Sequence, residues 1–357
     1  MCGYCDFART ADLRRRDEVV EAMHRELHDR RDFLHNINIG TVYFGGGTPS
    51  LLPPQELQRL MDTAAEYFDL SAVGEITAEA NPDDLTAQYI KELRRTSVNR
   101  LSIGIQSFDD DCLRMMNRRH TAAEAVGAVR RAQDAGFENI SVDLIFGVEG
   151  YGGEVLQRNI EETLALGVQH ISAYHLTIEP GTAFARRVAD GLMRAVGEEV
   201  SEAEYMTLHE RLAAAGYEHY EVSNYALPGR RSRHNSAYWS GEEYLGIGAG
   251  AHSFDGRRRC WNSPRVGEYL SGDGCGEETL TETDRRNEMI MTSLRTAEGL
   301  DMRRFGELFG REEAEKTLRG AESFLLSGLL VAEGERLRVP AEKFMMSDAV
   351  IGALFEA

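Results

Sequence analysis

Short β-rich segments alternate with helical patterns over residues 41–176, and this order constrains the fold more strongly than any other feature. The segments are rich in β-branched or aromatic residues and cover 41–44, 75–79, 100–105, 140–146 and 170–176. Helical patterns lie between them at 54–68, 84–96, 109–135 and 154–167, and an amphipathic helix is expected before them at 12–35. Because crossover helices let successive strands run parallel, the alternation predicts an α/β fold with a parallel sheet.

Polar residues cluster at the carboxyl ends of these predicted strands. They are Thr48, Glu79, Asn81, Gln106, Asp143 and Glu179. A β/α barrel builds its active site at this rim, whereas an open doubly wound sheet binds ligands at its switch point. The pattern alone leaves both folds open.

A glycine-rich run, Gly45–Ser50, follows the first predicted strand directly. Glycines let a ligand approach the backbone closely, and exposed peptide groups at a strand end can hold an ammonium or a phosphate. The run has neither the P-loop signature nor the glycine order of a dinucleotide fold. Taken alone, it is explained better by a tight turn than by a ligand site.

The alternation ends near residue 215, and the sequence then predicts two further units. Residues 216–283 form a Gly-rich, aromatic connecting region, and residues 284–357 form a small C-terminal domain. In that domain we expect helices at 284–295, 301–318 and 319–328, followed by a hairpin over 329–339 that turns at Glu333 and Gly334. This order suggests a winged-helix-like domain.

The charge and the apolar pattern exclude several classes of partner. The formal net charge is -19, which repels phosphate backbones and anionic lipid surfaces. No uncharged apolar run approaches the ~20 residues that a bilayer span needs. The five cysteines are too few and scattered for a disulfide scaffold. The sequence therefore predicts a cytoplasmic protein with reduced thiols, no nucleic-acid partner and no integral membrane segment.

A series of motifs resembles the radical S-adenosylmethionine enzymes of the oxygen-independent coproporphyrinogen III oxidase-like group. The matching segments, in family order, are 2–7 (CGYCDF), 41–50 (TVYFGGGTPS), 79–82 (EANP), 100–108 (RLSIGIQSF), 142–147 (VDLIFG), 176–182 (LTIEPGT), 220–226 (YEVSNYA), 234–239 (HNSAYW) and 243–253 (EYLGIGAGAHS). Any one of them is a weak signal, but so many in order are specific. The resemblance implies a partial (β/α) barrel, residues 1–215, followed by the small, mainly helical C-terminal domain.

The family holds a [4Fe-4S] cluster with the three cysteines of C-x-x-x-C-x-x-C. By resemblance, Cys2 and Cys5 correspond to the second and third ligands. The first ligand and the first barrel strand are expected upstream of Met1, if the chain as given starts at an internal Met. The alternatives are a member of the family with an incomplete cluster, or a redox C-x-x-C pair. Cys112, Cys260 and Cys275 match no cluster position.

The resemblance also assigns S-adenosylmethionine to the strand-end residues. Gly46, Gly47 and Thr48 would meet the methionine end of that cofactor. Its remaining groups would be lined by Glu79, Gln106, Arg118 and Asp143. Carboxylates and amides can hold an ammonium or a ribose, and an arginine can meet a carboxylate. Without the resemblance, Glu79 and Asp143 are explained better as strand-end residues whose carboxylates are satisfied by turn amides than as cofactor ligands.

Two departures from the oxidase pattern indicate the haem-chaperone branch. Phe7 stands where the oxidases carry a further cysteine, and His234, Tyr238 and Trp239 form a haem-associated His-Asn-x-x-Tyr-Trp segment. Imidazole is a common axial ligand of haem iron, and aromatic rings suit a macrocycle. His252 is a second, weaker candidate.

The resemblance thus implies a protein that binds haem and delivers it to haem-accepting proteins, with a [4Fe-4S] cluster and S-adenosylmethionine. The first alternative is an enzyme, an oxygen-independent coproporphyrinogen III oxidase that decarboxylates propionates. The second is a haem carrier with an incomplete cluster and no radical chemistry. The sequence does not indicate an oligomeric state.

Overall fold

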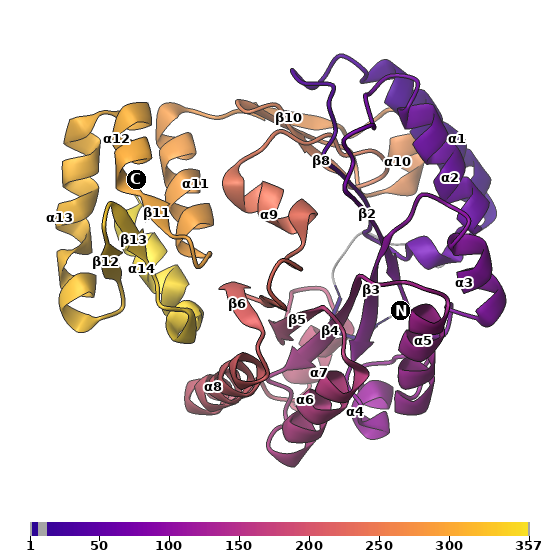
Figure 1. Cartoon of the computed structure of the whole chain (residues 1–357), viewed down its shortest axis with the longest axis horizontal. Coiled ribbons are helices and arrows are strands. Elements are labelled where there is room, and N and C mark those ends of the chain that lie inside the picture. The colour runs from indigo at the N-terminus through magenta and orange to yellow at the C-terminus, as the bar shows by residue number, and fades with distance from the viewer. Residues whose placement is uncertain (1, 6–12, 356–357) are drawn as a thin grey trace.

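A curled seven-stranded sheet forms the first part of the computed structural model, which describes residues 2–5 and 13–355 (Figure 1). Its strand order is β1-β2-β3-β4-β5-β7-β6. The first five strands run parallel: β1 (Thr41–Phe44), β2 (Glu75–Ala80), β3 (Arg100–Gln106), β4 (Ile140–Phe146) and β5 (His170–His175). Two antiparallel strands, β7 (Asn224–Ala226) and β6 (Glu218–Glu221), complete the sheet. The predicted α/β fold and its five parallel strands are confirmed.

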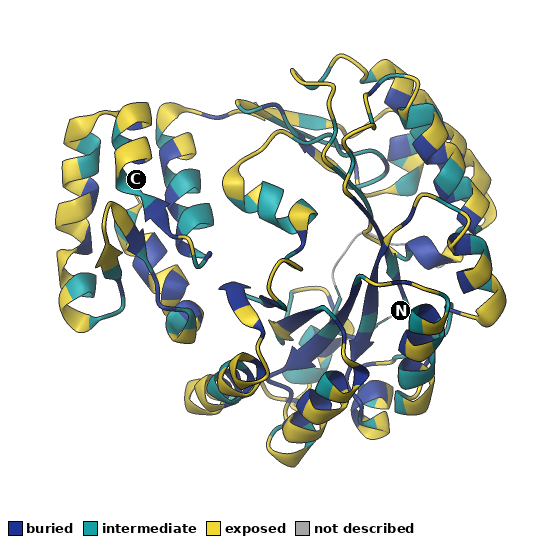
Figure 2. Cartoon of the chain, viewed as in Figure 1, coloured by how far each residue is buried: buried dark blue, intermediate teal, exposed yellow. Residues whose placement is uncertain are grey.

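Helices cover the convex side of this sheet. They are α2 (Pro54–Ala64), α3 (Ala87–Leu93), α5 (Ala122–Asp134), α6 (Glu154–Leu166) and α8 (Glu198–Ala214), and each contacts the next. α1 (Arg16–Asp29), which follows the short 3-10 turn Leu13–Arg15, packs against α2. Figure 2 shows the strands mostly buried and these helices exposed on their outer sides. This layer is the crossover arrangement that the strand-helix alternation predicts.

The single helix predicted over 109–135 is wrong, because the structure has two helices there. α4 (Asp110–Met115) ends before Asn117, which has the left-handed φ of 57°. The Thr121 side chain then caps α5 in a capping box with Glu124. The break places the segment between the two helices at the carboxyl end of β3.

Side chains alternate between the two faces of the sheet along each strand. In β3, Leu101, Ile103 and Ile105 are fully buried in the apolar core beneath the helices, whereas Arg100 and Ser102 face the concave side. The neighbouring strands repeat this pattern, and their concave positions are Thr41, Tyr43, Glu75, Thr77, Glu79, Ser141, Asp143, His170, Ser172 and Tyr174. The main core therefore lies outside the curl, and a polar surface lines its inside.

Glu75 anchors a later helix, α9 (Arg233–Ser240), on this concave side (Figure 1). Its carboxylate accepts the Arg233 amide at 3.0 Å, the His234 amide at 3.1 Å and the Ser232 hydroxyl at 3.3 Å. Arg100 lies on the other side of the carboxylate, 4.0 Å away, and both side chains are almost fully buried. The negative charge also suits the positive end of the helix dipole.

The connecting region adds a small antiparallel sheet. Its strands are β8 (His252–Phe254), β9 (Arg258–Trp261) and β10 (Gly276–Thr279), and α10 (Val266–Ser271) lies between the last two. α10 packs against α1. This sheet links the barrel to the C-terminal unit in Figure 1.

The C-terminal unit begins with three helices and also contains a three-stranded sheet. The helices are α11 (Glu282–Leu294), α12 (Met302–Phe309) and α13 (Arg311–Ser327), and the strands are β11 (Leu300–Asp301), β13 (Arg336–Arg338) and β12 (Val331–Glu333). A 3-10 segment (Ala341–Met346) and α14 (Ser347–Leu354) follow. The predicted hairpin is confirmed. The predicted helix boundary at 318 is wrong, because the break falls at Gly310, whose φ of 95° favours glycine.

The predicted unit boundaries stay predictions. The sheet continues past residue 215 through β6 and β7, and the C-terminal unit packs on the barrel where the Tyr205 hydroxyl donates to Ala341 and Phe344 meets the His219 ring. Among the described residues, no helix has the length and apolar character to cross a membrane.

We predict that Glu75→Gln lowers the free energy of unfolding by about 3 to 5 kcal/mol, because it leaves Arg100 buried without its counter-charge. Urea unfolding measures the change. Glu210→Gln on the exposed face of α8 is the matched control, with an expected change within about 0.5 kcal/mol. Equal stability of the Glu75 variant and the wild type would contradict this role.

Candidate functional site

A cavity of about 120 Å³ lies at the carboxyl ends of the parallel strands; we call it the rim pocket. It is lined by Gly47, Thr48, Pro49, Glu79, Ala80, Asn81, Ser102, Gly104, Gln106, Arg118 and Asp143. Six of the predicted cofactor-binding residues thus meet in one place, namely Gly47, Thr48, Glu79, Gln106, Arg118 and Asp143. Gly46 lies outside the lining but donates its amide to Glu79 at 3.1 Å. Glu179 is not part of the pocket lining.

Glu79 is the acidic wall of the rim pocket. One carboxylate oxygen accepts the Tyr43 hydroxyl at 2.7 Å, and the other accepts the Gly46 amide. Burial raises the pKa of Glu79 to about 7, although these hydrogen bonds lower it. A buried carboxylate of this kind gains stability from a bound cation, and such perturbed groups cluster at functional sites.

Asp143 and Gln106 form a second polar group in the rim pocket. Asp143 accepts the Ser102 hydroxyl at 3.2 Å, and burial raises its pKa against the hydrogen bonds from its serine neighbours. Gln106 ends β3 with a φ of 72°, and the register with β4 shifts between Gly104 and Gln106. This left-handed conformation is rare for a residue with a side chain and costs energy of order 1 to 3 kcal/mol. The bulge turns the Gln106 side chain toward Gly104. A Cβ added at Gly104 would lie 2.8 Å from the side-chain nitrogen of Gln106.

Arg118 joins the rim pocket to the N-terminal cysteines. One guanidinium nitrogen donates to Cys2 Sγ at 3.3 Å, and the other donates to Asn81 at 2.8 Å and to the Gly104 carbonyl at 2.5 Å. Its Nε is buried without a hydrogen-bond partner, and an unsatisfied buried N–H of this kind costs stability. The adjacent Arg119 instead pairs with Asp83 and Asp84 at the surface. The structure thus distinguishes the roles of Arg118 and Arg119, which the sequence alone did not.

Cys2 and Cys5 lie on a short segment that is bound to the barrel through both backbone groups of Gly3. The Gly3 amide donates to the Met116 carbonyl and the Gly3 carbonyl accepts the Phe184 amide, each at 3.0 Å. A Cβ at Gly3 would lie 2.6 Å from the Phe184 ring, so the close packing needs glycine. Both cysteines are half-buried.

The other three described cysteines differ from this pair. Cys112 is buried in an apolar cluster, and this burial raises its pKa to about 11, which disfavours the thiolate. Cys260 lies on β9 and Cys275 directly precedes β10. In the described part of the chain, no group of three or more His, Cys, Asp or Glu has the arrangement of a metal site.

The predicted haem-associated residues do not line the rim pocket. His234, Tyr238 and Trp239 all lie on α9, which Glu75 anchors on the concave side. The His234 ring stacks on Tyr43, with centroids 4.9 Å apart, and Tyr43 in turn bonds Glu79. His252, the weaker candidate, is exposed on β8 and stacks on Trp261.

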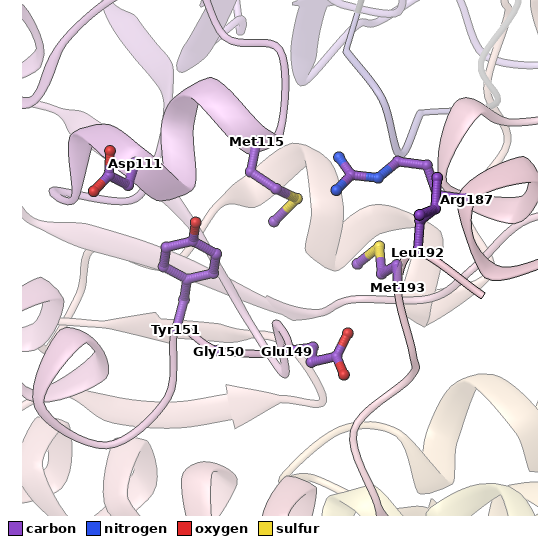
Figure 3. A pocket seen from close by; sticks show the side chains of 8 residues that line it. All are labelled: Asp111, Met115, Glu149, Gly150, Tyr151, Arg187, Leu192 and Met193. Atoms are coloured by element: carbon purple, nitrogen blue, oxygen red, sulfur yellow. The ribbon is translucent and has the colours of Figure 1, made fainter. Parts of the chain in front are cut away.

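A second cavity has a volume of about 500 Å³ (Figure 3). It is lined by Asp111, Met115, Glu149, Gly150, Tyr151, Arg187, Leu192 and Met193. Figure 3 shows Met115 and Tyr151 on one side, with Leu192, Met193 and Arg187 opposite. None of the predicted site residues lines it.

Sequence comparisons identify the family. The model of the Radical SAM superfamily matches residues 1–162, and that of the HemN C-terminal domain matches residues 280–343. The protein named Heme chaperone HemW from Lactococcus lactis subsp. lactis (strain IL1403) is 37% identical over 313 residues, which are 87% of this chain and 82% of the relative. Its namesake from Mycobacterium tuberculosis (strain CDC 1551 / Oshkosh) is 35% identical over 363 residues, 99% of this chain and 91% of the relative. The chain belongs to the HemW family of radical SAM proteins.

A comparison with solved structures addresses the fold. The structure of coproporphyrinogen III oxidase (HemN) from Escherichia coli matches with a TM-score of 0.84 and 21% sequence identity. The match covers 99% of this chain and 87% of that chain. At this identity the likeness shows the fold alone. The predicted family and its partial barrel with a helical C-terminal unit are therefore confirmed.

Membership of the radical SAM superfamily implies a [4Fe-4S] cluster and S-adenosylmethionine. The rim pocket fits the amino-acid end of that cofactor, since its lining brings the Glu79 carboxyl, which can meet an ammonium, together with the Arg118 guanidinium, which can meet a carboxylate. Its volume is below the about 300 to 1,000 Å³ of sites that enclose whole small molecules, so the nucleoside would extend beyond it. Cys2 and Cys5 fit the second and third cluster ligands, and the first ligand, expected upstream of Cys2, stays a prediction.

Several residues that build this candidate site were not predicted from the sequence. Tyr43 and Glu75 face the concave side of their strands, and Ser102 and Gly104 line the rim pocket beside Gln106. The period-2 alternation along β3 was a usable signal for Ser102 and Gly104. Both lie at alternate positions before Gln106, which was predicted to bind the cofactor, and alternate residues of a strand share one face. No local signal connects Glu75 with α9, which follows about 160 residues later in the sequence.

We predict that Glu79→Gln stabilises the ligand-free protein at high pH. An unfolded glutamate has a pKa of about 4.3. Since the folded value is higher, wild-type stability is lost as pH rises from about 4 to about 7. The variant has no carboxyl group at this position, so its stability does not fall with pH in this way. Its free energy of unfolding at pH 8 should exceed that of the wild type by about 1 to 3 kcal/mol.

Urea unfolding of both proteins at pH 8 and pH 4.5 measures this effect. The stabilisation should disappear at pH 4.5, where the wild-type carboxyl is protonated in the folded chain. Glu210→Gln, at an exposed position, controls for a general effect of removing one negative charge. The same stability difference at both pH values would contradict the assignment.

Proposed function

We propose that this protein binds haem at α9 and delivers it to haem-accepting proteins. The relatives at 35% and 37% identity are named heme chaperones, and the matches cover most of each relative. The observation that carries the proposal is the setting of His234, which is held by contacts on two sides of its ring. Phe7, which favoured the chaperone branch over the oxidase branch, lies outside the described residues.

The His234 imidazole has the features of a preformed iron ligand. Nδ1 contacts the Thr41 hydroxyl at 2.8 Å, and Nε2 contacts the Tyr238 hydroxyl at 3.1 Å. When Nδ1 carries the proton and donates to Thr41, the lone pair of Nε2 faces the Tyr238 hydroxyl. A hydrogen-bond partner on the second nitrogen orients metal-binding histidines. Burial lowers the pKa of His234 to about 4, so the ring is neutral at pH 7, and neutral imidazole binds metals.

Aromatic side chains around His234 supply the surface that a macrocycle needs. Tyr238 is 43% exposed, and its ring packs edge-on against Tyr244 with centroids 4.7 Å apart. Trp239 follows Tyr238 on the same short helix and is half-buried. Flat apolar rings of this kind bury large areas of a planar ligand. Iron binding at Nε2 would displace the weak Tyr238 contact.

The rim pocket belongs to the same proposal. When bound, the cluster and S-adenosylmethionine supply reductive cleavage of the sulfonium. Residues of this chain would hold the amino-acid end, with Glu79 facing the ammonium, Arg118 facing the carboxylate, and Gln106 and Asp143 lining the remaining groups. The cytoplasmic location and the three units 1–215, 216–283 and 284–357 are also part of the proposal.

An anaerobic absorbance titration with haem tests the proposal. We expect stoichiometric binding to the wild type, and a loss of affinity of at least about tenfold in His234→Ala and in Tyr238→Ala, because each removes a contact at the proposed site. His252→Ala is the matched control, since it removes an exposed histidine stacked on a tryptophan away from α9. Its affinity should equal that of the wild type.

The titration separates the proposal from its alternatives. No haem binding by the folded wild-type protein would overturn it, as would equal weakening by all three variants. Decarboxylation of coproporphyrinogen III under anaerobic conditions would favour the oxidase instead. Iron and sulfide counts after reconstitution separate a chaperone with a cluster from a haem carrier without one.

A further inference from the structure

Tyr43 contacts both parts of the proposed site. Its hydroxyl donates to Glu79 at 2.7 Å in the wall of the rim pocket. Its ring stacks on His234 with an interplanar angle of 18° and centroids 4.9 Å apart. One rigid side chain therefore contacts two groups. One is Glu79, which we propose to face the cofactor ammonium, and the other is His234, the proposed iron ligand.

Tyr43 is held in this position by its neighbours. A Cβ at Gly45 would lie 2.3 Å from the Tyr43 ring and 3.0 Å from the Glu79 carboxylate. Only glycine at this position lets ring and carboxylate approach as they do. The hydrogen bond to Glu79 and the stack on His234 then hold the Tyr43 ring at its two ends.

β1 contacts the His234 ring from two positions on the same face of the strand. Tyr43 covers the flat side of the imidazole, and Thr41, two residues earlier, contacts Nδ1. α9 adds the Tyr238 contact at Nε2. A shift of the Tyr43 ring would therefore move or release the imidazole.

We propose that Tyr43 is a positioning residue that couples occupancy of the rim pocket to the affinity of His234 for haem. The inference rests on the proposed function of both sites. A cation in the rim pocket holds Glu79 as an anion, and a hydrogen bond to an ionised acceptor is stronger than one to a neutral acceptor. The Tyr43 hydroxyl is then held more firmly, which fixes the stacked ring and orders His234.

Coupling of this kind is reciprocal and typically changes affinity about 5- to 150-fold. S-adenosylmethionine should therefore tighten haem binding by at least about fivefold, and haem should tighten S-adenosylmethionine binding by the same factor. Without the hydroxyl, the two sites should bind independently.

Haem titrations of the whole reconstituted chain, with and without saturating S-adenosylmethionine, test this coupling. The variant is Tyr43→Phe, which keeps the ring and removes the hydroxyl. The matched control is Tyr89→Phe, which removes a hydroxyl that donates to the Leu52 carbonyl on the outer side of the barrel. We expect saturating S-adenosylmethionine to lower the dissociation constant of haem by at least about fivefold in the wild type and the control, and by less than about twofold in Tyr43→Phe.

The ratio of the two dissociation constants is the informative readout, because structural damage would weaken both titrations equally. A ratio in Tyr43→Phe equal to that of the wild type would overturn the inference. A ratio of one in the wild type, with calorimetry showing that both ligands bind, would also overturn it and leave haem binding intact. Failure of haem to bind at all would instead refute the proposed function.

Discussion

The buried ion pair between Glu75 and Arg100 is the interaction on which the arrangement of the proposed site depends. It places a carboxylate at the base of the concave face, where water does not compete for it. The amino end of α9 uses that carboxylate as its cap, so the helix is fixed inside the curl of the sheet. This anchor brings His234 against Tyr43 and, through it, next to the wall of the rim pocket.

The sheet separates stability from function by face. Outward side chains such as Ile103 and Val142 are completely buried under the helices and supply the apolar core. The inward face instead carries charged and hydroxyl groups, some of them without partners, such as Thr77 Oγ1 and Glu221 Oε1. Buried polar atoms of this kind cost stability, and proteins keep such groups where a ligand or a reaction needs them. The polar inner face is therefore where the HemW-family chemistry is expected.

The sequence predicts the strands well because each is short, β-branched and bounded by helix breakers. It also brings Glu79, Gln106 and Asp143 together, because parallel strands end at one rim. It predicts poorly where tertiary structure decides. The backbone of Asn117 divides one apparent helix, and Gly310 sets a boundary that the apolar pattern places later. Contacts between distant segments, such as that between β1 and α9, leave no local pattern in the sequence.

The central claim is that α9 presents His234 as a ligand of haem iron. Pulsed electron paramagnetic resonance of the ferric haem complex, prepared from protein labelled with ¹⁵N-histidine, tests it most directly. The account predicts hyperfine coupling from a directly coordinated ¹⁵N nucleus, and the loss of that coupling when His234 alone is replaced. A haem complex without coordinated histidine nitrogen, or one that keeps the coupling in His234→Ala, would contradict it.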